Sequence, residues 1–157
     1  VTLVPEKREE VTTEGGLDVI KNKSKLKEII QRLLDVNIPV SLFIDPVQEQ
    51  LETSAEIKAG WIELHTGKYA ITKNKERALH LSTLKESTAK AKSYGLRVNA
   101  GHGLTYQNVE QIAAIEGIEE LNIGHTIISR ALAVGLSQAV KEMKSLIINP
   151  RKNNFYI

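Results

Sequence analysis

The sequence contains no cysteine, which excludes disulfide bonds, zinc–thiolate sites and cysteine nucleophiles. It has no apolar run approaching the ~18 residues that a membrane-spanning helix needs, and no segment patterned like a signal peptide. It also lacks a strong charge bias, because 21 Lys and Arg are interleaved with 19 Asp and Glu. No basic stripe is interleaved with aromatic residues, so a nucleic-acid surface is not indicated. We expect a cytoplasmic protein with neither a membrane nor a nucleic acid as its partner.

What is present is an ordinary globular composition. The 157 residues are 41% hydrophobic and 25% charged, which provides enough apolar surface for a core. A length in this range is typical of one domain. We therefore interpret residues 1–157 as a single domain.

Short apolar runs alternate with longer segments of helical periodicity. Leu26, Ile29, Ile30, Leu33 and Leu34, for example, fall on one face of a helix. This alternation predicts an α/β fold in which helices cover a parallel sheet. The predicted strands are Val1–Val4, Val40–Ile44, Trp61–His65, Leu96–Ala100 and Leu121–Ile123.

Local signals set the expected bounds of the other helices. Asp45 followed by Pro46 resembles an N-cap before a helix that stops at Gly60, and Thr105 can cap a later helix. Two longer helices are expected over Lys75–Tyr94, with Gly95 as its stop, and over Ser129–Ile148. In the last of these, Leu132, Leu136, Val140 and Met143 form one stripe.

Two architectures fit this order, an open doubly wound sheet and a barrel. In a doubly wound sheet both faces lie under helices, so the strands read as continuous apolar runs. Here polar residues alternate with apolar ones: Glu63 and His65 in one strand, Arg97 and Asn99 in the next, and Asn122 in the last. A polar interior inside one layer of helices favours a (β/α)8 TIM barrel.

The five units are short of a whole barrel. Strands recur about every 30 residues, so eight units need roughly 240 residues. We expect that this chain supplies about strands 4–8, the C-terminal part of a barrel, and that roughly 90 N-terminal residues are missing. The alternative is that five units are the entire fold.

Two histidines that are preceded by glycine follow predicted strands. His102, between Gly101 and Gly103, lies at a strand end where barrels place their active sites, and an imidazole suits proton transfer near neutral pH. Gly124 and His125 follow the last strand, where barrels bind phosphate through backbone N–H groups at a helix N-terminus. The alternatives are a turn histidine without a role and a simple loop glycine.

Other candidates carry less specific signals. Glu63 is a carboxylate on the inner face of a strand, where it is either used in chemistry or paired, for example with Arg97. The polar loop Glu6–Gly16, which contains Thr12, is either a lid over a ligand or a solvated loop. No cluster of histidine and carboxylate has metal-ligand spacing, so we expect no metal.

Six motifs in order closely resemble the pyridoxine 5′-phosphate synthase family, across Val1 to about Leu146. Each motif alone is modest, and their order and spacing make chance similarity very unlikely. They are LVPEKR (Leu3–Arg8), EVTTEGGLDV (Glu10–Val19), VSLFID (Val40–Asp45), IELHTG (Ile62–Gly67), VNAGHGLTY (Val98–Tyr106) and LNIGH (Leu121–His125).

The resemblance implies a (β/α)8 barrel enzyme that makes the pyridine ring of vitamin B6. It condenses 1-deoxy-D-xylulose 5-phosphate with 3-amino-2-oxopropyl phosphate to pyridoxine 5′-phosphate, inorganic phosphate and water. It implies no metal or organic cofactor, and a homo-oligomer that is often an octamer.

The resemblance also assigns roles by position. His102 matches the proton donor and Glu63 the carboxylate that stabilises the transition state. Thr12 and Gly103 match substrate-binding positions, and Gly124 and His125 match the pair that holds substrate phosphate. A further histidine and glutamate of the family match nothing in this chain, so we expect it to be incomplete for catalysis by itself.

Two other functions stay open. One is a different phosphosugar barrel, such as an aldolase or an isomerase, although none of the predicted strands carries a lysine for a Schiff base and Lys68 lies beyond its strand. The other is a phosphate-binding or oligomer-forming fragment without turnover, because an uncovered parallel edge strand favours assembly.

Overall fold

A computed structural model describes residues 1–5 and 15–153 of the chain. Strands and helices alternate, as the sequence predicts. The strands are β1 (Thr2–Leu3), β2 (Ser41–Ile44), β3 (Trp61–His65), β4 (Arg97–Gly101) and β5 (Ile118–Asn122). The helices are α1 (Lys23–Leu34), α2 (Gln48–Glu56), α3 (Gly67–Ile71), α4 (Asn74–Ser93), α5 (Val109–Ala113), α6 (His125–Val134) and α7 (Leu136–Asn153).

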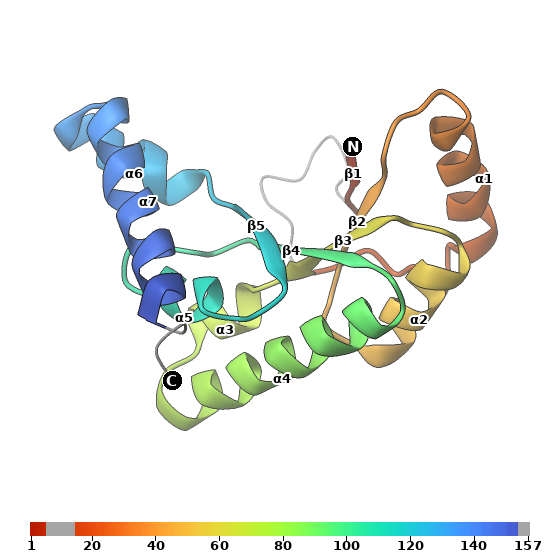
Figure 1. Ribbon diagram of the computed structural model, residues 1–157, viewed down its shortest axis with the longest axis horizontal. Helices are drawn as coiled ribbons and strands as arrows, with labels where there is room; N and C mark the ends of the chain where they lie inside the picture. The colour runs from red at the N-terminus through yellow and green to blue at the C-terminus, as the bar shows by residue number, and fades with distance from the viewer. Residues whose placement is uncertain (6–14, 154–157) are drawn as a thin grey trace.

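The five strands form one parallel sheet in the order β1-β2-β3-β4-β5. Each strand pairs with the next one along the chain, and the order nowhere reverses as it does in a doubly wound sheet. Parallel crossovers are right-handed as a rule, and when all of them run in one direction they place their helices on one side of a sheet. Figure 1 shows the helices in an arc around the sheet. The doubly wound alternative is therefore wrong. The α/β prediction is confirmed, and the sheet is a partial TIM barrel.

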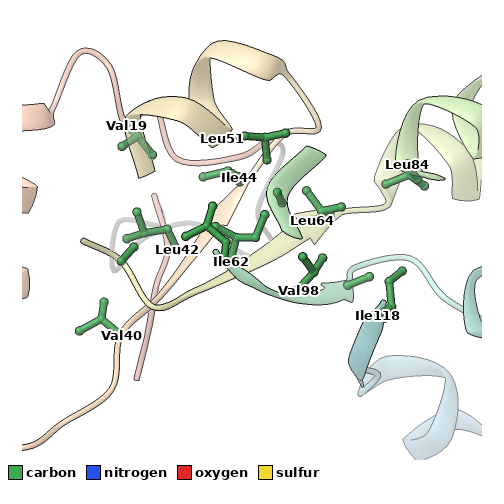
Figure 2. Close-up of a cluster of buried hydrophobic side chains, with 14 of the residues drawn as sticks. Val19, Val40, Leu42, Ile44, Leu51, Ile62, Leu64, Leu84, Val98 and Ile118 are labelled. Carbon is green, nitrogen blue, oxygen red and sulfur yellow. The ribbon is translucent and has the colours of Figure 1, made fainter. Parts of the chain in front are cut away.

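The two faces of the sheet differ in chemistry because side chains alternate along a strand. One face packs against the helices, and Figure 2 shows its side chains clustered with Leu51 of α2 and Leu84 of α4. The strand residues of this core with no exposed surface are Leu42, Ile44, Ile62, Leu64, Val98 and Ala100, and Ile118 of β5 joins them at 4% exposure. The opposite face carries Phe43, Glu63 and Asn99 in one register row. The predicted polar interior is thus confirmed.

The start of α2 differs from the prediction. Asp45 does not cap the helix: α2 begins at Gln48, its N-cap is Val47, and no side chain bonds the free N–H groups. The Asp45 carboxylate bonds the His65 ring instead, with Oδ1 2.8 Å from Nδ1. A long-range partner thus displaces the local capping interaction.

The expected helix over Ser129–Ile148 is two helices. Gly135 separates α6 from α7 with a φ of +82°, a left-handed conformation that glycine adopts without strain. The expected stripe is divided as a result, since Met143 is buried and Leu132 is 88% exposed. No helix among the described residues is both long and apolar enough to cross a membrane.

Core truncation should be costly while the same change on α6 should not. Leu42 is fully buried in the sheet core, so Leu42→Ala should lower the free energy of unfolding by about 2–5 kcal/mol. Leu132→Ala removes the same atoms from an exposed site and should change it by less than about 0.5 kcal/mol. Urea unfolding followed by circular dichroism measures both. Equal losses in the two variants would contradict the assigned core.

Candidate active site

A cavity of about 650 Å³ opens at the carboxyl ends of the strands. Residues of the first strand segment and of the last one line it together, so the sheet curves around this space. The lining residues are Thr2, Val4, Phe43, Glu63, His102, Gly103, Leu104, Thr105, Asn122, Ile123, Gly124, His125 and Thr126. Among them are five of the six predicted site residues: Glu63, His102, Gly103, Gly124 and His125.

The sixth predicted residue, Thr12, lies outside the described part of the chain, as does most of the predicted lid loop. Within residues 1–5 and 15–153, no three histidine or carboxylate side chains are grouped so that they could hold a metal ion. We therefore assign no metal site.

Glu63 is buried on the inner face of β3 and is held by β5. The Asn122 side chain donates a hydrogen bond from Nδ2 to Glu63 Oε2 over 2.7 Å. Burial raises the pKa of the Glu63 carboxyl, and the nearby Glu120 charge raises it further, against the opposing effect of the hydrogen bond from Asn122. Glu63 is therefore a carboxyl group that gains or loses a proton more readily near neutral pH than an exposed glutamate.

Arg97 is not the partner of Glu63, which settles the alternative of an ion pair between them. The Arg97 guanidinium lies over the Trp61 ring, 3.6 Å from its centroid. Its Nε donates to both carboxylate oxygens of Glu119 over 3.0 Å. In register, Arg97 stands opposite Trp61 and not Glu63, so its side chain leaves the Glu63 carboxyl to Asn122.

The raised pKa of Glu63 gives stability a specific pH dependence. A carboxyl whose folded pKa is raised stabilises the fold at low pH, and this contribution is lost as pH rises through the folded pKa. Glu63→Gln removes the cost of the buried charge. It should therefore raise the Tm at pH 7, and the gain should vanish as pH falls below 4.5, the ordinary pKa of a glutamate. Thermal unfolding between pH 3 and pH 8 measures this.

Glu119 provides the matched control with the opposite sign. The hydrogen bond from Arg97 lowers the pKa of the Glu119 carboxyl. Its stabilising contribution is present above the unfolded pKa and is lost as pH falls through the folded one. Glu119→Gln should therefore lower the Tm at pH 7 and have no effect at low pH. Shifts of the same sign in both variants at pH 7 would contradict the assigned environments.

His102 lies in a tightly turned loop directly after β4. Both His102 and Gly103 have left-handed backbones, with φ of +79° and +74°. Gly103 must be glycine, because a Cβ there would lie 2.7 Å from the Ala70 Cβ. The buried Thr66 hydroxyl is 2.7 Å from the Gly101 carbonyl oxygen and 2.5 Å from that of His102, and it donates to this pair. Backbone strain at a residue that faces a cavity is typical of functional sites.

Gly124 and His125 form the start of α6 at the other side of the cavity. Gly124 is the N-cap, and no side chain satisfies the first N–H groups of the helix. The N–H groups of the first turn have no acceptor within the helix, and the helix dipole makes this end favourable for an anion. His125 and Thr126 also line the cavity. The arrangement can hold a phosphate group without a lysine.

Sequence reasoning missed the partners of these residues. Alternation along the last strand predicts that Asn122 faces the interior. It does not predict the hydrogen bond from Asn122 to Glu63, because the sequence of one strand does not reveal its register with the others. The sequence identifies Thr66 only as part of the IELHTG motif, and it identifies Asp45 only as a candidate helix cap. The pairing of His65 with Gly101, and of Gly101 with Asn122, is what brings these side chains together.

The site therefore combines three chemical abilities in one cavity. It has an imidazole at His102, a buried carboxyl at Glu63 and a helix N-terminus at Gly124 and His125. The first two can move protons or offset developing charge, and the third can fix an anionic substrate. This combination suits acid–base chemistry on a phosphorylated small molecule.

Comparison with known proteins agrees with this chemistry. The family described as "Pyridoxal phosphate biosynthesis protein PdxJ" matches residues 1–149. A relative from Prochlorococcus marinus (strain NATL1A), named pyridoxine 5′-phosphate synthase, is 87% identical over 157 residues, which are all of this chain and 64% of the relative.

More distant relatives with that name align with nearly the whole of this chain at lower identity. One from Prochlorococcus marinus (strain MIT 9211) is 64% identical over 155 residues, 99% of this chain and 64% of the relative. One from Synechococcus sp. (strain WH7803) is 62% identical over 156 residues, 99% of this chain and 63% of the relative. The chain thus spans slightly less than two thirds of the length of these curated relatives, and it belongs to the PdxJ family of pyridoxal phosphate biosynthesis proteins.

Proposed function

We propose that this chain provides part of the active site of a pyridoxine 5′-phosphate synthase. The reaction condenses 1-deoxy-D-xylulose 5-phosphate with 3-amino-2-oxopropyl phosphate to pyridoxine 5′-phosphate, inorganic phosphate and water. One observation carries the proposal: Glu63, His102, Gly103, Gly124 and His125, which are distant in sequence, line a single cavity. The names of the relatives support the same activity.

Each residue has a role in this proposal that follows from its chemistry. His102 donates a proton during the eliminations and ring closure, which are successive proton transfers. Glu63, held by Asn122, offsets the positive charge of an iminium group that develops in the low-dielectric interior. The positive charge of the iminium group favours the ionised form of the Glu63 carboxyl, against the burial that raises its pKa.

The remaining roles concern substrate position. Gly124 and His125 hold a substrate phosphate through the free N–H groups of α6, and Gly103, which lines the same cavity, contacts the substrate through its backbone. Thr12 is a further proposed substrate contact. Holding a phosphate at a fixed place lets the reacting carbons meet, which lowers the entropic part of the barrel enzyme's activation free energy.

The proposal includes an assembly and a location. We propose a homo-oligomer, an octamer by resemblance to the family, that acts in the cytoplasm.

An aldolase of the Schiff-base type fits the site less well. None of the five strands carries a lysine. Lys68 lies in the short helix α3, beyond the end of β3, and it is not among the residues that line the cavity. The site therefore favours acid–base chemistry over covalent catalysis by lysine.

The test is to restore the rest of a synthase. A chimera joins this chain to the part of the Prochlorococcus marinus (strain NATL1A) relative that the chain does not cover. With both substrates, the chimera should release pyridoxine 5′-phosphate and inorganic phosphate, while the 157-residue chain should give neither. Turnover by the chain alone at the rate of the chimera would refute the division of the active site. Failure of a folded chimera to form product would favour the non-catalytic alternative.

A further inference from the structure

Next to the cavity lies a hydrogen-bonded pair that the proposed mechanism does not use. His65, at the end of β3, and Asp45, just after β2, approach to 2.8 Å between Nδ1 and Oδ1. The His65 side chain is 6% exposed and that of Asp45 is 35% exposed. Neither residue is among those that line the cavity. A role for the pair must therefore act through a residue that does.

The hydrogen bonds fix where the His65 proton lies. The hydrogen bond with His65 lowers the pKa of the Asp45 carboxyl, and the weaker effect of the Gly16 N–H lowers it further. Asp45 is therefore a carboxylate, which can only accept hydrogen bonds. His65 must then carry a proton on Nδ1. Its Nε2 is buried and has no hydrogen-bond partner among the described residues. A proton on Nε2 would leave a buried donor unpaired, so the neutral ring with the Nδ1 proton fits this site.

The His65 ring is also clamped in position. A Cβ on Gly67 would lie 2.4 Å from Nε2, so only the bare glycine backbone leaves room for the ring. Phe43 packs on it at 5.1 Å between ring centroids. On its remaining side the ring meets His102 at 5.0 Å and 69°, an edge-to-face arrangement.

We propose that Asp45 and His65 are positioning residues that set the orientation of the His102 imidazole toward the cavity. The Asp45 carboxylate fixes the tautomer and rotation of the His65 ring, and that ring provides the surface against which His102 packs. The catalytic consequence rests on the proposed function, since it assumes that His102 transfers a proton. The structural coupling does not depend on it.

The backbone at Gly16 holds Asp45 in place on the side away from His65. Its carboxylate accepts from the Gly16 N–H, and a Cβ on Gly16 would lie 2.1 Å from the Asp45 backbone nitrogen. The nearby Leu17 N–H donates to the Phe43 carbonyl over 2.7 Å. The segment at Gly16 and Leu17 thus fixes Asp45, which fixes His65, which contacts His102.

The first experiment tests whether Asp45 and His65 affect the His102 ring, and it uses the 157-residue chain without any assay of activity. The chain has four histidines, so selective ¹⁵N labelling of histidine gives a spectrum in which each ring can be assigned. At neutral pH, His65 should be the tautomer with a proton on Nδ1 and none on Nε2. Finding the opposite tautomer in the wild-type chain would overturn the proposal before any substitution is made.

Two variants then separate the hydrogen bond from the ring. Asp45→Asn can donate to Nδ1 and should move the His65 proton to Nε2, against Gly67. His65→Asn keeps a donor for Asp45 but removes the ring beside His102. Both should shift the His102 ring signals, whereas His80→Asn, on the distant outer helix α4, should not. Unchanged His102 signals in both variants would overturn the proposal.

The second experiment places the same variants in the active chimera. A misoriented proton donor should lower kcat by about tenfold to a hundredfold with little change in KM. A merely structural role would lower the Tm without this separation of kcat from KM, and that result would overturn the proposal. If the wild-type chimera has no activity while the NMR coupling is present, the proposed function fails and the positioning inference stands.

Discussion

Replacing His102 with asparagine should lower the kcat of the chimeric synthase by about 10²–10⁴-fold, the usual contribution of a positioned acid or base. Asparagine suits this position because His102 has a φ of +79°, and asparagine adopts the left-handed region more readily than most residues. The variant should therefore keep the loop and lose only the titratable group. Steady-state kinetics with both substrates measure the effect.

His80→Asn is the control for this experiment. His80 lies on α4 and is not among the residues that line the cavity, and its Nε2 is 4.0 Å from Oε1 of Glu76. Its replacement should leave kcat and KM unchanged. If His102→Asn retained more than about a tenth of the wild-type kcat, His102 would not be the proton donor, given the usual size of such contributions.

The second large effect is expected from one added methyl group on β4. A Cβ on Gly101 would lie 2.2 Å from Glu63 Oε1 and 3.1 Å from the Cβ of Asn122. Gly101→Ala must therefore displace the Glu63 carboxyl and disturb its hydrogen bond to Asn122. A displacement of about 1 Å in a reacting group can cost about 10²-fold in rate, and we expect a loss of that size.

Gly60→Ala is the matched control. Nothing lies within 4 Å of the position that its Cβ would occupy, and its φ is not positive. It should leave turnover unchanged and stability within about 0.5 kcal/mol of wild type. A Gly101→Ala chimera with normal turnover would show that the position of the Glu63 carboxyl is not needed for catalysis.

Most of the fold could be predicted because strands and helices differ in period. Alternation along β3 and β4 was enough to place Glu63, His65 and Asn99 on the inner face, and hence to favour a barrel over a doubly wound sheet. The site residues could be nominated because the carboxyl ends of parallel strands meet at one edge. A histidine preceded by glycine at two such ends is a local signal that needs no knowledge of register.

What could not be predicted depends on contacts between distant segments. Asp45 has the local pattern of a helix cap, yet it bonds His65, which is 20 residues away. The sequence suggests Arg97 as a partner for Glu63, and only the register of β3, β4 and β5 shows that Asn122 takes this place instead. The break at Gly135 was missed because helical periodicity continues across it, and a single glycine inside such a pattern is often tolerated.

The central claim is that this cavity holds a phosphorylated substrate at the start of α6. The most direct test is to titrate the ¹⁵N-labelled 157-residue chain with 1-deoxy-D-xylulose 5-phosphate and follow the backbone amide signals. The account predicts saturable shifts that are largest at Gly103, Gly124, His125 and Thr126, which line the cavity. Saturable shifts confined to other surfaces, or none at these four amides at saturating ligand, would contradict it.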